Sequence, residues 1–424
     1  MSATIAVIGT GYVGLTTGAA FAALGHTVVC ADIDEDKIRR LNDGEIPIVE
    51  DGLERLVHEN VKAGRLSFVV GAAKAAAECE FSYLCVPTPQ GLDGSADLSF
   101  IEAAAAEIGP VLQPESIVVN KSTVPVGSTR VVERALGRSD VFVVSNPEFL
   151  REGSAVNDFM KPDRVVIGSD HQAAAIRVAS LYMGIPAPIM VTDPASAETI
   201  KYAANAFLAT KLSFVNAVAA ICEAVGADVA DVMLGIGYDK RIGQDFLQPG
   251  PGWGGSCFPK DTRALAHIAD EAGYDFHLLK GVLAVNDEQF ERVVDKIERL
   301  VGGSLDDTTV AVWGLTFKAR TDDLRESPSL EIIGRLRDRG ATIVGYDPAV
   351  HRQLDGITVV DDPYAACDGA DVLAVLTEWD EFRWLDFDKV ADLLTAPRVV
   401  DGRNLLDSAA LKRRGFTYDG IGRS

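Results

Sequence analysis

Residues 5–14 read Ile5-Ala6-Val7-Ile8-Gly9-Thr10-Gly11-Tyr12-Val13-Gly14, a short apolar run followed by a G-x-G-x-x-G pattern. The apolar run is typical of a buried strand, and the glycines predict a tight turn that opens a helix. Gly9 allows the bend, Gly11 lets backbone approach a pyrophosphate, and Gly14 permits close packing of helix on strand. The stretch therefore predicts a strand-turn-helix unit of a parallel α/β sheet, with a dinucleotide at the helix N-terminus.

The next expected strand, residues 27–31, leads into Asp32, about 20 residues beyond the glycines. A carboxylate there accepts hydrogen bonds from the adenosine ribose and repels a 2′-phosphate, so we expect NAD rather than NADP. Lys37 follows on the next helix turn, and we add Tyr12, Val13 and Thr88 to the expected cofactor-binding residues. The alternative is a glycine turn that only packs the sheet, and the same unit occurs in proteins of many functions.

The composition of the 424 residues predicts a cytoplasmic globular protein of two or three domains. Its formal net charge of −22 argues against nucleic acid or an anionic membrane as a partner. The six cysteines are scattered without metal-ligand spacing, which favours a reducing compartment and no metal site. The first expected strand begins at Thr4, so we expect no signal peptide, and the apolar runs are too short to span a bilayer.

Three domains are predicted along the chain, at residues 1–193, 194–303 and 304–424. In the first, apolar runs at 81–86, 116–120 and 141–145 alternate with helical patterns, as in a doubly wound sheet. Asp193-Pro194 predicts the start of one long helix that runs to Val225 and bridges domains, and a second helical segment covers 260–301. The α/β pattern then restarts, with strands at 309–313, 342–346 and 372–376 and a helix at 329–339. We expect two Rossmann-like domains joined by a helical middle domain.

Cys257 lies in Gly254-Gly255-Ser256-Cys257-Phe258-Pro259-Lys260-Asp261. Two glycines leave room for a substrate, and both Lys260 and a helix beginning near Pro259 would favour the thiolate. A cysteine packed among small core residues is the alternative. Beside a nicotinamide cofactor, a nucleophilic cysteine suggests oxidation through a sulfur-bound intermediate.

Three further segments carry groups suited to such chemistry. Lys201 and Asn205 share one face of the long helix, where they could hold an oxyanion, although Lys201 could also be a solvated charge. Residues 146–153, Asn146-Pro147-Glu148-Phe149-Leu150-Arg151-Glu152-Gly153, and residues 121–127, Lys121-Ser122-Thr123-Val124-Pro125-Val126-Gly127, both follow expected strand ends. A solvated loop explains the first segment equally well, and capping of the next helix by Ser122 or Thr123 explains the second.

These motifs together resemble the nucleotide-sugar dehydrogenases, the UDP-glucose/GDP-mannose dehydrogenase family, and most closely its members that oxidise UDP-glucose. Further matches are the run from Phe246 to Asp261, Gly314-Leu-Thr-Phe-Lys318, and Asp323-Leu-Arg325-Glu-Ser-Pro328. The motifs occur in the family's order over essentially the whole chain. The resemblance implies oxidation of the sugar's primary alcohol to a carboxylate with two NAD. Alternatives are a relative acting on GDP-mannose or a UDP-N-acetylhexosamine, or a non-catalytic nucleotide-binding protein.

The resemblance also implies roles for individual residues. Cys257 would be the nucleophile that forms a thiohemiacetal and then a thioester, and Lys201, Asn205 and Asp261 would handle the alcohol oxygen and its proton. Thr123 and Glu152 would position water near the nicotinamide, and Glu148 is a candidate base for thioester hydrolysis. The other implied contacts are Lys260 and Arg325 toward NAD, and Glu148, Phe149, Leu150, Arg151, Glu152, Lys201, Asn205, Phe246, Leu247, Gly250, Gly254 and Lys318 toward the UDP-sugar.

One residue is expected to serve a neighbouring subunit. Arg241 corresponds to an arginine that family members present to the neighbour's substrate, which implies a homodimer. The chain departs from many bacterial relatives at Ala217 and at Trp253. Trp253 lies inside the substrate loop and could alter sugar selectivity, whereas Ala217 lies well beyond Asn205 on the helix.

Overall fold

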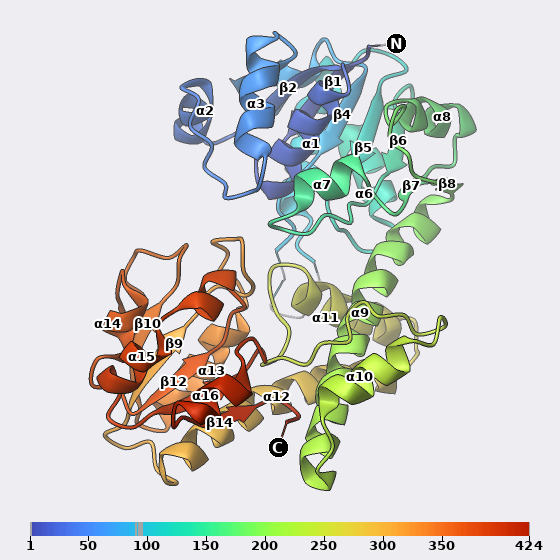
Figure 1. Ribbon diagram of the computed structural model, residues 1–424. Helices are drawn as coiled ribbons and strands as arrows, with labels where there is room; N and C mark the ends of the chain where they lie inside the picture. The colour runs from blue at the N-terminus through green and yellow to red at the C-terminus, as the bar shows by residue number, and fades with distance from the viewer. Residues whose placement is uncertain (1, 90, 92–95, 424) are drawn as a thin grey trace. The chain divides into compact units, whose positions relative to one another are not determined.

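The computed structural model describes residues 2–89, 91 and 96–423. The chain divides into two compact units, and each is described by itself (Figure 1). Unit 1 comprises residues 1–204 and 263–272, and unit 2 comprises residues 205–262 and 273–424. The predicted three-domain division remains a prediction.

Unit 1 is built on an eight-stranded sheet of order β3-β2-β1-β4-β5-β6-β7-β8. Its strands are β1 (Thr4–Ile8), β2 (Thr27–Asp32), β3 (Leu66–Val70), β4 (Phe81–Leu84), β5 (Ile117–Asn120), β6 (Phe142–Ser145), β7 (Val165–Gly168) and β8 (Ile189–Thr192). The order reverses between β1 and β4, which is the switch point where doubly wound folds bind ligands. The expected parallel sheet has one exception, because β6 and β7 pair antiparallel at Ser145 and Gly168. The short helix between these two strands does not carry the chain back across the sheet.

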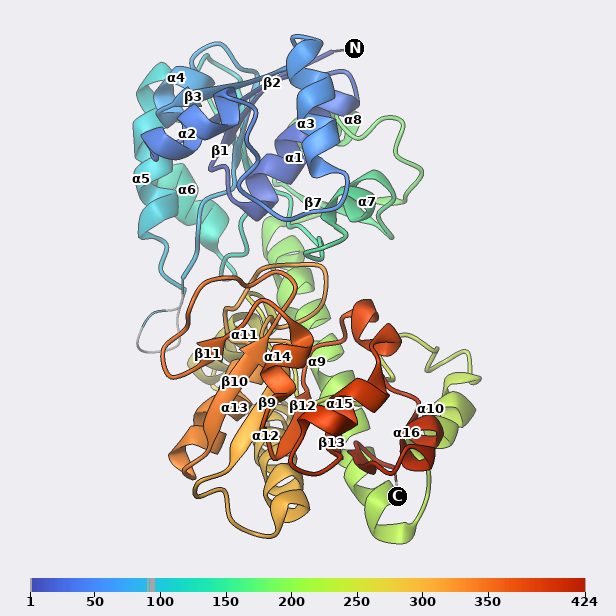
Figure 2. The same cartoon turned by 60° about the vertical axis from the view of Figure 1, so that its left-hand side comes forward.

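Helices cover both faces of this sheet (Figure 2). They are α1 (Tyr12–Ala23), α2 (Glu35–Asn42), α3 (Leu53–Lys62), α4 (Ala72–Ala76), α5 (Ser99–Ile108), η1 (Gly109–Val111), α6 (Ser128–Leu136), α7 (Ala155–Met160) and α8 (Gln172–Ser180). Buried residues of α1, α3, α7 and α8 form one core with the sheet, and those of α4, α5 and α6 form another. Both faces are therefore buried, as the continuous apolar runs predict.

Unit 2 contains a parallel six-stranded sheet of order β11-β10-β9-β12-β13-β14. Its strands are β9 (Thr309–Trp313), β10 (Thr342–Tyr346), β11 (Thr358–Val359), β12 (Val372–Val375), β13 (Arg398–Asp401) and β14 (Thr417–Gly420). The helices of the C-terminal half are α13 (Pro328–Asp338), α14 (Pro363–Cys367), η2 (Asp380–Trp384), α15 (Phe387–Leu393) and α16 (Ser408–Arg413). The sheet again has the doubly wound order, so the second Rossmann-like lobe is confirmed.

Helix α9 (Pro194–Val225) has the bounds predicted from the sequence. Asp193 caps its N-terminus by accepting hydrogen bonds from Ser196 N at 2.8 Å and Ser196 Oγ at 2.6 Å. By length and composition alone α9 could cross a membrane. Glu198, Lys201 and Asn205 are nevertheless buried on it with hydrogen-bond partners, which marks α9 as a helix of the protein core.

The predicted helical segment 260–301 is helical with one break that was not anticipated. It forms α11 (Phe258–Glu271) and α12 (His277–Val301). The chain breaks at Gly273, whose φ of +76° is a left-handed conformation that ends a helix. A helix between the two predicted ones, α10 (Val229–Gly237), was not anticipated; Asp228 caps it through Ala230 N.

Candidate active site

The glycine turn after β1 leaves an open backbone surface at the N-terminus of α1. A Cβ on Gly9 would lie 2.5 Å from Cys85 O, and one on Gly14 would lie 1.9 Å from Gly9 O, so both positions require glycine. Nothing lies within 4 Å of the corresponding point on Gly11. Space over Gly11 and amides at a helix N-terminus fit a pyrophosphate, and the turn therefore suits the expected cofactor.

Asp32, expected to bind a ribose, is held in place at the end of β2. Its Oδ2 accepts hydrogen bonds from Thr10 N at 2.9 Å and Thr10 Oγ1 at 2.6 Å, and Lys37 Nζ lies 3.2 Å away. Burial works to raise the pKa of Asp32, but the hydrogen bonds from Thr10 and the charge of Lys37 lower that pKa overall. Ile33, next to it, is 79% exposed and offers an apolar surface beside this carboxylate.

A buried ion pair joins the loop after β6 to α9. Lys201 Nζ lies 2.9 Å from Glu148 Oε1, and both side chains are almost completely buried. Leu150 N donates to the other carboxylate oxygen at 2.5 Å. Burial works to raise the pKa of Glu148, yet the adjacent Lys201 and the other donors lower it, so the carboxylate is ionised at neutral pH. Lys201 is therefore not a solvated helix charge, and Glu148 is not part of a solvated loop.

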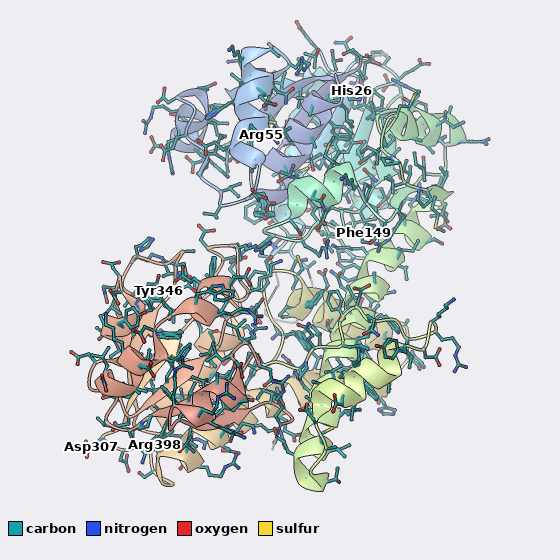
Figure 3. The ribbon with its side chains drawn as sticks, in the orientation of Figure 1. His26, Arg55, Phe149, Asp307, Tyr346 and Arg398 are labelled. Carbon is teal, nitrogen blue, oxygen red and sulfur yellow. The ribbon has the colours of Figure 1, made fainter. Side chains whose placement is uncertain are left out.

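The remainder of the loop after β6 is held from several sides. Figure 3 labels Phe149, whose ring centroid lies 3.7 Å from the Arg164 guanidinium carbon and 5.4 Å from Lys201 Nζ. Arg151 forms an ion pair with Asp158, at 2.6 Å between Nη2 and Oδ1.

Gly153 N, at the end of the loop, donates to the Tyr12 hydroxyl and, at 2.7 Å, to Glu50 Oε2. The tyrosine of the glycine turn and the loop that carries Glu152 are thus hydrogen-bonded to each other.

The loop after β5 does not use its hydroxyls to cap the next helix. Ser122 Oγ donates to Val86 O at 2.7 Å, and Thr123 is buried. The N-terminus of α6 is capped instead by Glu198 of α9, which accepts from Gly127 N at 2.6 Å and Thr129 N at 3.0 Å. Burial raises the pKa of Glu198 against these bonds. Thr88, expected at the cofactor, lies partly exposed in the loop after β4.

In unit 2, Cys257 immediately precedes α11. Asp261 N donates to Cys257 O at 2.9 Å, so the cysteine is at the helix N-terminus as predicted. Ser256 Oγ lies 3.6 Å from the sulfur. The Asp261 carboxylate is fully buried and accepts from Asn205 Nδ2 at 2.6 Å and from Lys260 Nζ at 2.5 Å. Asn205 and Asp261 therefore form one hydrogen-bonded pair beside the first turn of α11, and Lys260 contacts Asp261.

The glycines before Cys257 are required by close packing. A Cβ on Gly254 would lie 1.9 Å from Glu326 O, and one on Gly255 would lie 2.6 Å from the Phe317 ring. Trp253 is buried, with its indole donating to Ser213 Oγ at 2.9 Å and its backbone paired with Asn286. Because this ring packs into the core of unit 2, we interpret Trp253 as a residue that fixes the conformation of the loop before Cys257.

Family models match the chain along its length. The NAD binding domain of the UDP-glucose/GDP-mannose dehydrogenase family matches residues 3–185, its central domain matches 195–288, and its UDP binding domain matches 311–408. The chain belongs to this family. It is accordingly an NAD-dependent oxidoreductase of nucleotide sugars.

Similar proteins include several dehydrogenases of this family. The UDP-glucose 6-dehydrogenase TuaD of Bacillus subtilis is 47% identical over 99% of this chain and 93% of its own length. A UDP-glucose 6-dehydrogenase of Rhizobium meliloti is 46% identical over 99% of both chains. Among solved structures, a UDP-glucose dehydrogenase of Pyrobaculum islandicum has a TM-score of 0.93 at 39% identity, over 100% of this chain and 98% of that one.

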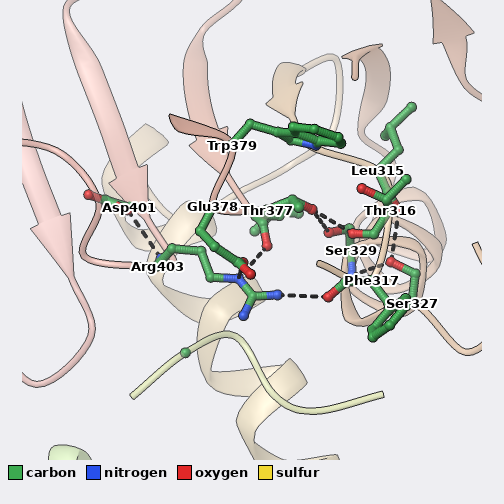
Figure 4. Close-up of polar contacts among 12 residues, drawn as sticks. Leu315, Thr316, Phe317, Ser327, Ser329, Thr377, Glu378, Trp379, Asp401 and Arg403 are labelled. Carbon is green, nitrogen blue, oxygen red and sulfur yellow. Dashed lines mark hydrogen bonds and ion pairs between the residues drawn. The ribbon is translucent and has the colours of Figure 1, made fainter. Parts of the chain in front are cut away.

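In the region matched by the family's UDP binding domain, Arg403 contacts residues that follow β9 and β12 (Figure 4). Arg403 follows β13; its guanidinium donates to Leu376 O at 2.8 Å and Phe317 O at 3.0 Å, and it pairs with Glu378 at 3.0 Å. A Cβ on Gly250 would lie 3.5 Å from Arg403 Nη1. We did not predict Arg403 from the sequence, although its position directly after an apolar run is a strand-end signal.

Asp347 of unit 2 lies at the strand end that corresponds to the position of Asp32 in unit 1. Asp347, at the end of β10, is fully buried and accepts from Leu315 N at 2.7 Å, Thr316 N at 3.0 Å and the Trp379 indole at 3.1 Å. The Asp347 carboxylate is therefore hydrogen-bonded to groups of the protein itself.

The other predicted site residues of unit 2 differ in their exposure. Lys318 Nζ lies 5.4 Å from the Phe317 ring centroid, and Arg325 pairs with Asp323 at 2.6 Å on the surface. Arg241 is 88% exposed in its side chain and pairs with Asp239. Phe246 has a φ of +60°, which is rare for a bulky residue, in a segment fixed by Lys211 Nζ at 2.5 Å from Asp245 O. Leu247, next to it, is buried.

Proposed function

We propose that this protein oxidises UDP-glucose to UDP-glucuronate by removing four electrons with two NAD, through intermediates bound to Cys257. The observation that carries the proposal is the position of Cys257 at the N-terminus of α11, with the buried Asn205–Asp261 pair beside the same helix turn. UDP-glucose is favoured because relatives at 45–47% identity are UDP-glucose 6-dehydrogenases. By comparison, a UDP-D-ManNAc dehydrogenase of Pyrococcus horikoshii is 27% identical.

The first oxidation requires the alcohol to lose a proton while its oxygen is held. We assign that oxygen to Lys201 and Asn205, which lie one turn apart on α9, and we assign Asp261 to orienting the Asn205 amide. When bound, NAD accepts the hydride in each oxidation. Gly9, Gly11, Val13 and Gly14 would hold its pyrophosphate, and Asp32 would hold its ribose.

The remaining steps take place on sulfur. The Cys257 thiolate adds to the aldehyde carbon and gives a thiohemiacetal, and the second oxidation converts this adduct to a thioester. Water then attacks the thioester carbon, the carbon–sulfur bond breaks, and the acid leaves with the thiolate restored. We assign activation of that water to Glu148, with Thr123 and Glu152 positioning it. Covalent capture keeps the aldehyde from escaping between the oxidations.

Binding of the diphosphate needs local cations in a protein of net charge −22. We assign Arg403 and Lys318 to this role, since they follow the ends of β13 and β9. Arg403 lies beside Gly250, and Lys318 lies next to Phe317, whose ring packs against Gly255. Phe246, Leu247, Gly250 and Gly254 would line the sugar nucleotide, and Lys260 and Arg325 would approach NAD.

A homodimer is supported by an apolar stripe on α9. Phe207, Phe214 and Ile221 recur at heptad spacing with exposed fractions of 66%, 57% and 60%, and Val225 extends the row. Tyr238 and Ile242, which flank the exposed Arg241, add exposed apolar area in the segment after α10. A second copy of the chain covering these residues would bury the stripe and bring Arg241 to the neighbour's substrate.

We also infer a cytoplasmic location. Cys30, Cys79, Cys85, Cys222 and Cys367 are buried thiols, which suits a reducing compartment.

Replacement of the nucleophile tests the mechanism. We expect Cys257→Ala to form no UDP-glucuronate, while Cys222→Ala, which also removes a thiol from unit 2, retains acid formation. The products are separated by anion exchange and identified by mass. An alanine variant at position 257 with normal acid output would refute the sulfur-bound intermediates.

A further inference from the structure

Unit 1 buries two lysines around one carboxylate, and the proposed mechanism uses only one of these lysines. Lys121, Glu148 and Lys201 are 5%, 5% and 3% exposed. Lys201 contacts Glu148 directly. Lys121 follows β5 in the segment that carries Thr123, and no role has been given to it.

The Lys121 ammonium is held by neutral groups. Its Nζ lies 3.3 Å from Asn146 Oδ1 and 3.4 Å from the Tyr182 hydroxyl. The Tyr182 hydroxyl also donates to Asn146 Oδ1, and Asn146 Nδ2 donates to Val166 O at 2.7 Å. Asn146 is thus fixed with its oxygen toward the lysine, so the network sets the position of the cation without neutralising its charge.

Glu148 is the carboxylate that balances this charge. Burial lowers the pKa of Lys121 to about 8, and the charge of Glu148 acts in the opposite direction. In return, the charge of Lys121 adds to that of Lys201 in lowering the pKa of Glu148. An isolated ammonium is costly to bury, and a carboxylate that acts on it offsets part of that cost.

We propose that Lys121 is a positioning residue that keeps Glu148 ionised and in place while Lys201 engages the substrate oxygen. The proposal rests on the role assigned to Glu148 in the proposed function. Lys201 is assigned to two partners, Glu148 and the alcohol oxygen. When its ammonium binds the alcohol oxygen, it stabilises the Glu148 carboxylate less. Lys121 is held by Tyr182 and by Asn146, which lies two residues before Glu148, so its charge stays near Glu148 throughout the reaction.

The thiol of Cys85 and the hydroxyls of Tyr182 and Tyr83 also lie around this cluster, and they stay neutral at acidic and neutral pH. Burial raises the pKa of Cys85 to about 12, and burial raises the pKa of Tyr182 and of Tyr83 still further. Within the described residues, Lys201 is the other charge that lowers the pKa of Glu148. Removing the Lys121 cation withdraws a stabilising charge from ionised Glu148, so the Glu148 pKa must rise.

The test is the pH dependence of kcat for the oxidation of UDP-glucose, because thioester hydrolysis takes place in the enzyme-bound complex. We expect Lys121→Met to move the acid limb of the profile upward by about one pH unit, because an opposite charge nearby lowers a carboxyl pKa by about 1–3 units. Tyr182→Phe removes a hydrogen bond from the same network but keeps the charge, and its limb should stay within about 0.3 unit of the wild type. Lys121→Gln, which retains polar contacts to Asn146 and Tyr182, replaces the methionine variant if that one does not fold.

A second comparison separates this role from a merely structural one. In a Glu148→Gln background, Lys121→Met should lower kcat less than about twofold, since coupled residues are not additive. An unshifted acid limb, or an equal loss of kcat in both backgrounds, would overturn the role of Lys121 alone. A fully active Glu148→Gln variant would overturn the role of Glu148 in the proposed function, and the role of Lys121 with it.

Discussion

Lys201 of α9 and Glu148 of the loop after β6 form a hydrogen-bonded ion pair of 2.9 Å in which both side chains are buried. The pair connects two segments that are far apart in the sequence and holds each charge without solvent. Such a pair is expensive to break, since the partner that remains is an uncompensated buried charge.

Loss of Lys201 should therefore affect stability and rate together. We expect Lys201→Met to lower the free energy of unfolding by about 3–5 kcal/mol and kcat by about 10²–10³-fold. Denaturant unfolding and steady-state NADH formation measure the two effects. Lys62→Met, at an exposed helix position, is the matched control and should change neither. A stable, fully active Lys201→Met variant would contradict both expectations.

Gly254 should tolerate no side chain. A Cβ there would lie 1.9 Å from Glu326 O, a backbone atom, so the loop before Cys257 must shift. We expect Gly254→Ala to cost about 3 kcal/mol or more of stability and to abolish activity. Gly334→Ala, in α13 with nothing within 4 Å of the added carbon, should be neutral or slightly stabilising. Thermal unfolding of the two variants, with activity measured beside it, distinguishes these outcomes.

Asp32 should determine the choice between NAD and NADP. Asp32→Ser removes the carboxylate that pairs with Lys37 and leaves that cation beside the ribose position. We expect KM for NAD to rise about 10-fold and the preference for NAD over NADP to fall by a similar factor. The exposed Asp36→Asn is the control. Unchanged cofactor preference in the Asp32 variant would remove Asp32 from the cofactor site.

The dimer can be tested by complementation. If Arg241 acts on the neighbour's substrate, Cys257→Ala and Arg241→Ala are each inactive, but a mixed dimer contains one intact site. Random exchange of equal amounts should restore about a quarter of wild-type activity. Phe214→Asp, in the middle of the apolar stripe, should prevent the recovery and give a monomer by light scattering. No recovery from two variants that do form mixed dimers would show that Arg241 acts within its own chain.

The sequence predicted the parts of the fold that depend on local pattern. The glycine turn, the strand ends and the bounds of α9 follow from apolar runs, glycines and the Asp193-Pro194 cap, which act over a few residues. The helix at 260–301 was predicted without a break because Gly273 alone gives a weak signal against a strong apolar period. The antiparallel pairing of β6 and β7 depends on the path of the connection between them, and the apolar pattern of a strand does not indicate its direction in the sheet.

The candidate site was less predictable where partners come from distant segments. The cysteine, Lys201 and Glu148 have recognisable motifs, but a motif does not reveal which charge pairs with which. The electrostatic interaction of Lys121 with Glu148 involves a lysine that Asn146 and Tyr182 hold in place, and both partners come from other segments of the chain. The position of Trp253 in the expected substrate loop did not reveal that its indole donates to Ser213 in the core. Arg403 was missed because the chain offers many arginines and only the fold places this one at a strand end.

The central claim is a four-electron oxidation of UDP-glucose at one sulfur-bound site. Its most direct test is the number of NADH molecules formed per molecule of limiting UDP-glucose, measured by absorbance at completion with excess NAD. We predict two NADH per sugar, with UDP-glucuronate as the product. One NADH per sugar, with an aldehyde as the product, would contradict the role of Cys257, and no NADH would contradict UDP-glucose as the substrate.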